Sequence, residues 1–137
     1  LSAKNTVETF MDVEAIEKYA EKVNEEYVQK RLTLKIPKKI IALNTPFTQT
    51  FFEKTPLGNQ ELIKVRLLPP NIQPFKTGVQ IYDYTVSFTT LTEKKMIGVI
   101  IEDENIAQLQ HSLFEYIWNT LPNFTPGATP KLPSASP

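Results

Sequence analysis

The apolar and polar positions are most regular near the end of the chain. Residues 97–101 form a continuous apolar run that ends at the acidic residues 102–104, and an amphipathic segment then extends to Leu121. A continuous apolar run is typical of a strand that is covered on both faces. Asp103 is expected to cap the following helix, because its side chain can accept a hydrogen bond from a free amide of the first turn. The predicted buried face of that helix comprises residues at helical spacing, which are Ile106, Leu109, Leu113, Phe114, Ile117, Trp118 and Leu121.

Periodicity and turn residues predict the earlier elements in the same way. In chain order these are a helix over 13–31 capped by Asp12, a strand over 39–43, a short helix that starts at Pro46 with Thr45 as its cap, a strand over 62–68, and a hairpin with strands 78–82 and 85–91 around Asp83 and Tyr84. Helices that alternate with strands and a hairpin predict an α/β domain, in which a mixed sheet is flanked by helices.

Composition divides the chain into three parts. A length of 137 residues supports one domain with its own core. Residues 1–9 are short and polar, and we expect a linker or the end of a strand there, as the end of a truncated preceding segment. The α/β domain is expected over 10–121. Residues 122–137 are rich in Pro, Ser, Thr and Ala and are expected to be disordered, because they cannot bury enough apolar surface to offset their ordering entropy. The chain opens with Leu1 rather than Met, which favours a fragment or domain boundary.

Charge and residue counts exclude several classes of function. The formal net charge is zero, so the chain has no global basic field to attract nucleic acid. The absence of cysteine excludes disulfides and thiolate metal sites and fits a cytoplasmic location. No apolar run approaches ~18 residues, so no membrane helix is expected. With four glycines and no phosphate-binding loop, no cofactor is expected.

Few side chains are candidates for chemistry. His111 is the single histidine, and we expect it to be a partly buried structural residue, since no second histidine completes a catalytic or metal set. The acidic run 102–104 lacks the spacing of a calcium loop and is better explained as helix capping. For an anionic ligand the candidates are Arg66, within an apolar strand, and Lys30 and Arg31, at the end of the first helix. A carboxylate partner or solvent for Arg66, and the helix dipole for the other two, are the structural alternatives.

Several segments together resemble one family of regulators. They are residues 27–31, 65–69, 81–83, 97–103 and 114–118, so the likeness spans most of residues 10–121. In their order and hydrophobic pattern they resemble the C-terminal effector domain of TrmB-like prokaryotic transcriptional regulators. That resemblance implies the fold of half of a phospholipase D-type enzyme.

The resemblance does not extend to the catalytic motif of phospholipase D enzymes. Their chemistry requires a histidine nucleophile, a lysine two residues later and an aspartate five residues beyond that. Placing this aspartate on Asp83 puts the histidine position at Lys76 and the lysine position at Gly78. No catalytic residue is therefore expected, and a shared fold does not by itself imply the reaction.

The resemblance leads to a functional expectation. We expect a non-catalytic effector-sensing or dimerisation domain, with a winged-helix DNA-binding domain absent from this chain. The expected partners are a second copy of the chain, a possible small-molecule effector and, only through the absent domain, duplex DNA; no membrane partner is expected. The alternative is a degenerate phospholipase D-like module that binds proteins or anionic ligands.

Overall fold

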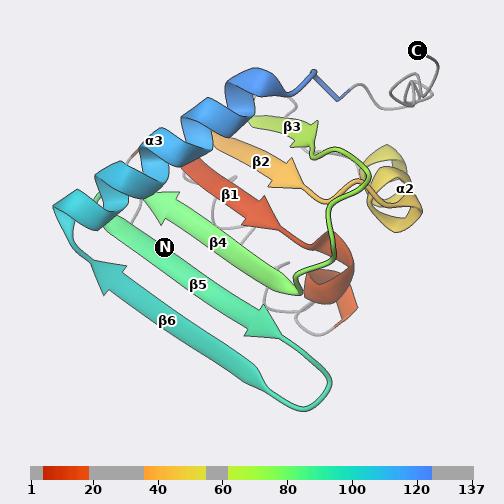
Figure 1. Cartoon of the computed structure of the whole chain (residues 1–137), viewed down its shortest axis with the longest axis horizontal. Helices are drawn as coiled ribbons and strands as arrows, with labels where there is room; N and C mark the ends of the chain where they lie inside the picture. Colours follow the sequence, from red (N-terminus) through yellow and green to blue (C-terminus); the bar gives the residue numbers. More distant parts are fainter. Residues whose placement is uncertain (1–4, 19–35, 55–61, 125–137) are drawn as a thin grey trace.

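The chain folds around one mixed sheet of six strands in the order β3-β2-β1-β4-β5-β6 (Figure 1). This computed structural model describes residues 5–18, 36–54 and 62–124. The elements are β1 (Val7–Met11), β2 (Lys38–Ala42), α2 (Pro46–Lys54), β3 (Ile63–Leu67), β4 (Thr77–Tyr82), β5 (Thr85–Leu91), β6 (Met96–Glu102) and α3 (Glu104–Thr120), with a further helical segment over 13–18. Strands β1, β2 and β3 are parallel, whereas β4, β5 and β6 join antiparallel. The predicted fold class, a mixed sheet with a hairpin and flanking helices, is confirmed.

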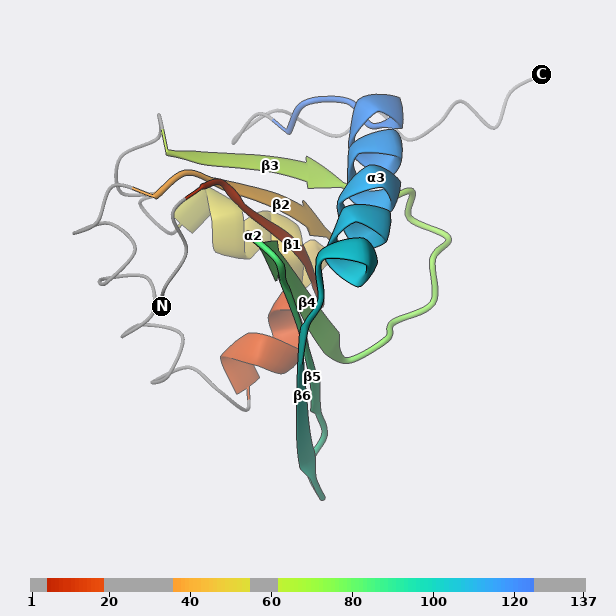
Figure 2. The ribbon, with the colours of Figure 1, turned by 90° about the vertical axis from the view of Figure 1, so that its left-hand side faces the viewer.

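Helices cover both faces of the sheet. In Figure 2, α3 lies on one face, and α2 and the helical segment 13–18 lie on the other. On the α3 face, Phe114 meets Phe10 edge to face with ring centroids 5.1 Å apart and stacks on Trp118 at 5.8 Å. On the opposite face, Phe52 of α2 joins a separate buried cluster with Val13. The sheet therefore carries two cores, one for each face.

Local capping explains where the helices begin. The side chain of Asp103 accepts a hydrogen bond from the amide of Ile106 at 2.9 Å, as the sequence predicted. Thr45 Oγ1 accepts from the amide of Thr48 at 3.1 Å and so caps α2, also as predicted. At the β4–β5 turn, Asp83 adopts a positive φ of 51°, a region that Asp tolerates better than most residues.

Removal of the α2 cap gives the first testable prediction. Thr45→Ala deletes the acceptor for the amide of Thr48 and is expected to lower the free energy of unfolding by about 1 kcal/mol. Urea unfolding followed by circular dichroism measures this change. Thr45→Ser keeps the acceptor and is expected to retain most of the stability; an equal loss in both variants would contradict the capping role.

The sheet and its packing extend past the expected bounds of the domain, 10–121, at both ends. Residues 7–9, expected to be a linker or the end of a strand, belong to β1, which lies inside the sheet between β2 and β4. At the other end, the amide of Phe124 bonds to the carbonyl of Val65 at 3.2 Å, and its ring packs against Phe52. The expected disorder therefore does not begin at residue 122. The remaining tail, 125–137, and the predicted helix beyond residue 18 lie outside the described residues.

The apolar run 97–101 forms a strand, as predicted, but the expectation that it is covered on both faces was wrong. It forms β6, which is the edge strand of the sheet, and six of its seven residues are exposed. The stripe predicted for α3 is only partly buried: Phe114 and Trp118 are enclosed, whereas Leu109 is 57% exposed and Leu113 47%. Ile106 is exposed as well. Because α3 crosses the sheet instead of lying in a layer between two partners, it buries a narrower stripe than its apolar content suggested.

Candidate functional site

A pocket lies beside α3, at the end of the sheet where β1 begins and β4 ends. Its cavity volume is about 490 Å³. It is bounded by the approach to β1, the β4–β5 turn and the first half of α3. The charged and titratable side chains in its lining are Glu8, Lys39, Tyr82, Asp83, Tyr84, Glu104, His111 and Glu115. Four carboxyl groups against one lysine make this an acidic pocket.

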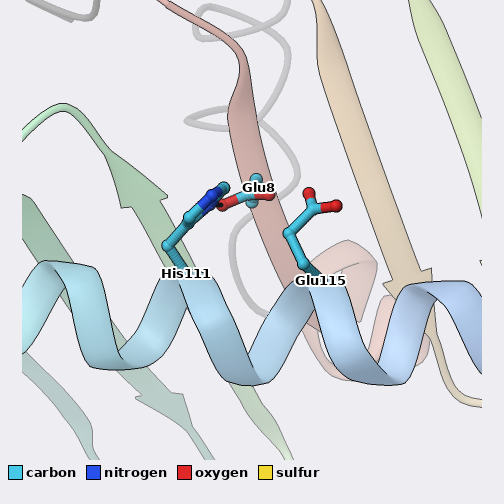
Figure 3. Close-up of side chains that lie close together, drawn as sticks. All are labelled: Glu8, His111 and Glu115. Carbon is cyan, nitrogen blue, oxygen red and sulfur yellow. Dashed lines mark hydrogen bonds and ion pairs between the residues drawn. The ribbon is translucent and has the colours of Figure 1, made fainter.

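Three of these side chains converge across the interface of α3 and the sheet. His111 and Glu115 are four residues apart and project from one side of α3, while Glu8 rises from β1 beneath them (Figure 3). The Nδ1 atom of His111 lies 2.5 Å from Oε1 of Glu8. Donor atoms of all three residues lie within 4.8 Å of one another. Lys39 of β2 completes the group, because its Nζ atom lies 3.2 Å from Oε1 of Glu115.

Glu8 and Glu115 differ in burial, and their pKa values shift in opposite directions. Glu8 is 4% exposed, and burial, together with a hydrogen bond to Glu115, raises its pKa from 4.5 to about 7; the neighbouring His111 opposes that rise. The same hydrogen bond to Glu8 lowers the pKa of Glu115, and Lys39 lowers it further. The pair therefore favours a proton on Glu8 and a negative charge on Glu115.

Glu8, His111 and Glu115 can together bind a proton or a cation. One imidazole nitrogen and two carboxylates are ligands that Zn²⁺ and related divalent transition metal ions accept, and the pocket leaves room for water or a small ligand at further positions. In the metal-free protein, the short contact between His111 and Glu8 satisfies the buried carboxyl group. Among the pocket-lining residues there is no serine, threonine or cysteine paired with His111 as an activated nucleophile.

The positions assigned to the phospholipase D motif lie away from this group. Lys76 precedes β4, and Gly78 pairs with Met11, at the opposite end of β1 from Glu8. A Cβ atom on Gly78 would lie 3.1 Å from Cδ1 of Ile16, which leaves little room for the lysine that the motif requires. Asp83 alone, at the β4–β5 turn, lines the pocket.

The structure gives Arg66 a packing role. Its Nη1 atom donates to the carbonyl of Trp118 at 2.6 Å, and its Nε atom donates to Oδ1 of Asn123 at 3.2 Å. The guanidinium also lies 4.4 Å from the centroid of the Trp118 ring. Arg66 thus ties the end of α3 to β3, and it does not line the pocket. Lys30 and Arg31, the other predicted anion ligands, lie outside the described residues.

Sequence reasoning missed the partners of His111. It considered only a second histidine, whereas the structure supplies two glutamates. The spacing of His111 and Glu115 on one helix face was a usable signal, since residues four apart are neighbours on a helix. Glu8 carried no such signal, because nothing in the sequence places residues 1–9 inside the sheet beneath the last helix.

Comparison with solved structures supports the fold. A phospholipase D family member, Nuc from Salmonella typhimurium, is similar to this chain with a TM-score of 0.57 and 16% sequence identity. The match covers 90% of this chain and 84% of that one. No family model and no curated protein matches the chain. The chain therefore has a phospholipase D-like fold, and the finer TrmB-like resemblance stays a prediction.

Within the described residues, no helix is long and apolar enough to cross a membrane.

Proposed function

We propose that this chain is a non-catalytic effector-sensing and dimerisation domain of a TrmB-like transcriptional regulator, whose DNA-binding domain lies outside the sequence given. The observation that carries the sensing role is the acidic pocket in which Glu8, His111 and Glu115 converge. Its ligand is a cation, and a divalent transition metal ion is the simplest one that these donors fit. Lys76 stands at the position of the motif's histidine, and Gly78 stands at the position of its lysine. The absence of both catalytic residues supports the absence of phosphodiesterase activity.

A second reading, binding of anionic ligands by a degenerate phospholipase D-like module, has less support. Of its three candidate residues, Arg66 is engaged with Trp118 and Asn123. Lys39, the lysine of the pocket lining, is paired with Glu115. The acidic lining of the pocket would repel an anion.

Zinc binding tests the sensing role directly. Isothermal titration of the metal-free chain with Zn²⁺ is expected to show one ion bound per chain. His111→Ala is expected to weaken binding by more than roughly tenfold, because it removes the only nitrogen ligand. Gln108→Ala, which changes a pocket wall without removing one of the three donors, serves as the matched control and is expected to bind like the parent.

Two results would contradict this assignment. The first is no heat of binding and no shift in melting temperature with Zn²⁺ at millimolar concentration. The second is binding that His111→Ala leaves unchanged. The regulatory context is tested separately by the reading frame upstream of Leu1, where a segment with a winged-helix pattern and a basic recognition helix would support it and any other coding context would contradict it.

A further inference from the structure

Strand β6 combines an edge position with an apolar sequence. In the part of the chain that the structure describes, no strand lies on its outer side. Met96 is 63% exposed and Ile100 67%, while Ile97 and Val99 are each 46% exposed. No charged residue interrupts positions 96–101. Natural edge strands are commonly protected by charges, prolines or bulges, and an apolar edge without them is a template for another strand.

The backbone of β6 has hydrogen-bonding groups that point away from β5. The amide of Thr92 donates to the carbonyl of Lys95, and the amide of Asp103 donates to that of Tyr84. Because hydrogen-bonded and non-bonded pairs alternate along an antiparallel ladder, these two bonds determine the pattern between them. The residues of β6 whose backbone bonds to β5 are Ile97, Val99 and Ile101. The residues whose amides and carbonyls face outward are Met96, Gly98, Ile100 and Glu102.

We propose that β6 pairs antiparallel with β6 of a second copy of this chain, with Val99 facing the partner's Val99 across a two-fold axis. Gly98 then lies opposite the partner's Ile100, and Met96 opposite the partner's Glu102. All four of these residues have outward-facing backbone groups, so they form the hydrogen-bonded pairs of the new ladder. The two sheets become one continuous sheet. The inference names the surface for the dimerisation proposed above and rests on that part of the proposal.

The charges that flank β6 complement one another in this arrangement. Lys95 lies opposite the partner's Asp103, because the bonds of Thr92 to Lys95 and of Asp103 to Tyr84 extend the β5–β6 ladder by one pair at each end. The symmetry repeats this pair at the other end of the interface. Lysines therefore meet carboxylates at each end of an apolar centre, which favours the correct register and disfavours a parallel approach.

Other registers lose this complementarity. The two-fold axis must pass through a residue, because facing side chains must lie on the same side of the joined sheet. Moving the axis to Gly98 places Lys95 opposite the partner's Ile101. Moving it to Ile100 places Lys95 opposite the partner's Asn105. Of these three arrangements, the one about Val99 opposes Lys95 to a carboxylate.

The pairing also buries side chains on the face that carries α3. Phe88 packs in the core beneath α3, and Val99 is its partner across the β5–β6 ladder, so Val99 points to the same face. Ile97 and Ile101 share that face because side chains alternate along a strand. In the dimer, Ile97 meets the partner's Ile101 and Val99 meets its equivalent, which forms an uninterrupted apolar row. The strand that is exposed in one copy becomes central in the pair.

Sedimentation equilibrium of the full 137-residue chain tests this inference. The parent chain is expected to be a dimer at micromolar concentration. Val99→Lys places two lysines face to face at the two-fold axis of the apolar row and is expected to raise the dimer dissociation constant by at least roughly tenfold. Tyr116→Lys is the matched control, since Tyr116 is 73% exposed on α3 and lies off the proposed interface. A parent chain that is monomeric at 100 µM, or a dimer that Val99→Lys leaves intact, would overturn the inference.

Charge reversal tests the register itself. Lys95→Glu and Asp103→Lys are each expected to weaken the dimer, and the double variant is expected to restore it. Within one copy these residues lie just beyond opposite ends of β6, about 26 Å apart by strand rise, so restoration requires contact between copies. Additive weakening in the double variant would contradict this register.

Backbone amide exchange gives a further measure that needs no substitution: the amides of Met96, Gly98, Ile100 and Glu102 should gain protection as protein concentration rises, and unchanged exchange would contradict the pairing.

The outcomes separate this inference from the sensing role. A monomeric chain that binds Zn²⁺ through His111 would leave the pocket assignment standing and remove the β6 interface. A β6-paired dimer without zinc binding would do the reverse.

Discussion

Replacing Trp118 with alanine is expected to lower the free energy of unfolding by about 3–5 kcal/mol. The ring is 5% exposed, stacks on Phe114 and has the guanidinium of Arg66 over its face. Its loss leaves a cavity between α3 and the sheet and removes the cation–π contact that holds β3 to the end of the helix. Urea unfolding followed by far-ultraviolet circular dichroism measures the change without relying on tryptophan fluorescence.

A neighbouring residue on the same helix provides the control for this result. Tyr116 is 73% exposed, and Tyr116→Ala is expected to change the free energy of unfolding by less than about 0.5 kcal/mol. Similar losses in the two variants would mean that helix propensity, and not core packing, governs both. A Trp118→Ala protein as stable as the parent would contradict the position of the ring in the core.

The stability of the metal-free protein is expected to fall as pH rises from 5 to 8. The pKa of Glu8 is raised from 4.5 to about 7 by burial and by its contact with Glu115. The folded state therefore binds this proton more tightly than the unfolded state. The resulting stabilisation is fully present below 4.5 and is lost as pH passes through 7, with a total of up to roughly 3 kcal/mol by linkage.

The other titrating group of this pair acts in a different window. Because the pKa of Glu115 is lowered, its contribution is lost as pH falls through the acid range, below the window of Glu8. Chemical unfolding at several pH values in EDTA measures the dependence. Glu8→Gln removes the titrating group and is expected to flatten the profile between pH 5 and 8; a profile as steep as that of the parent would assign the effect to another group.

The parts of the fold that the sequence predicted well depend on local interactions. The β4–β5 hairpin follows from the turn at Asp83, and the starts of α2 and α3 follow from side chains that cap their own first turns. The sequence of β1 gave a misleading signal, because its polar residues Glu8 and Thr9 are buried. A strand with polar side chains inside the domain resembles a linker when it is judged by composition alone.

The candidate site was harder to predict than the fold because it depends on tertiary placement. Glu8 and His111 are 103 positions apart in the sequence, and they meet only because β1 occupies the strand position beneath α3. The pairing of His111 with Glu115 within one helix was accessible from spacing. For β6, hydrophobicity correctly indicated a strand, but the expected cover on both faces is not found among the described residues, where β6 is an exposed edge strand.

Asp103 is the single residue between β6 and α3, and it caps the helix while its amide bonds to the β4–β5 turn. The edge strand and the helix that carries His111 and Glu115 are thereby joined through a short, hydrogen-bonded corner. A ligand that shifts α3 relative to β1 must move or strain this corner and so alter the geometry of the outer edge. Any free energy of coupling that follows is reciprocal: the degree to which ligand binding favours self-association equals the degree to which self-association favours ligand binding.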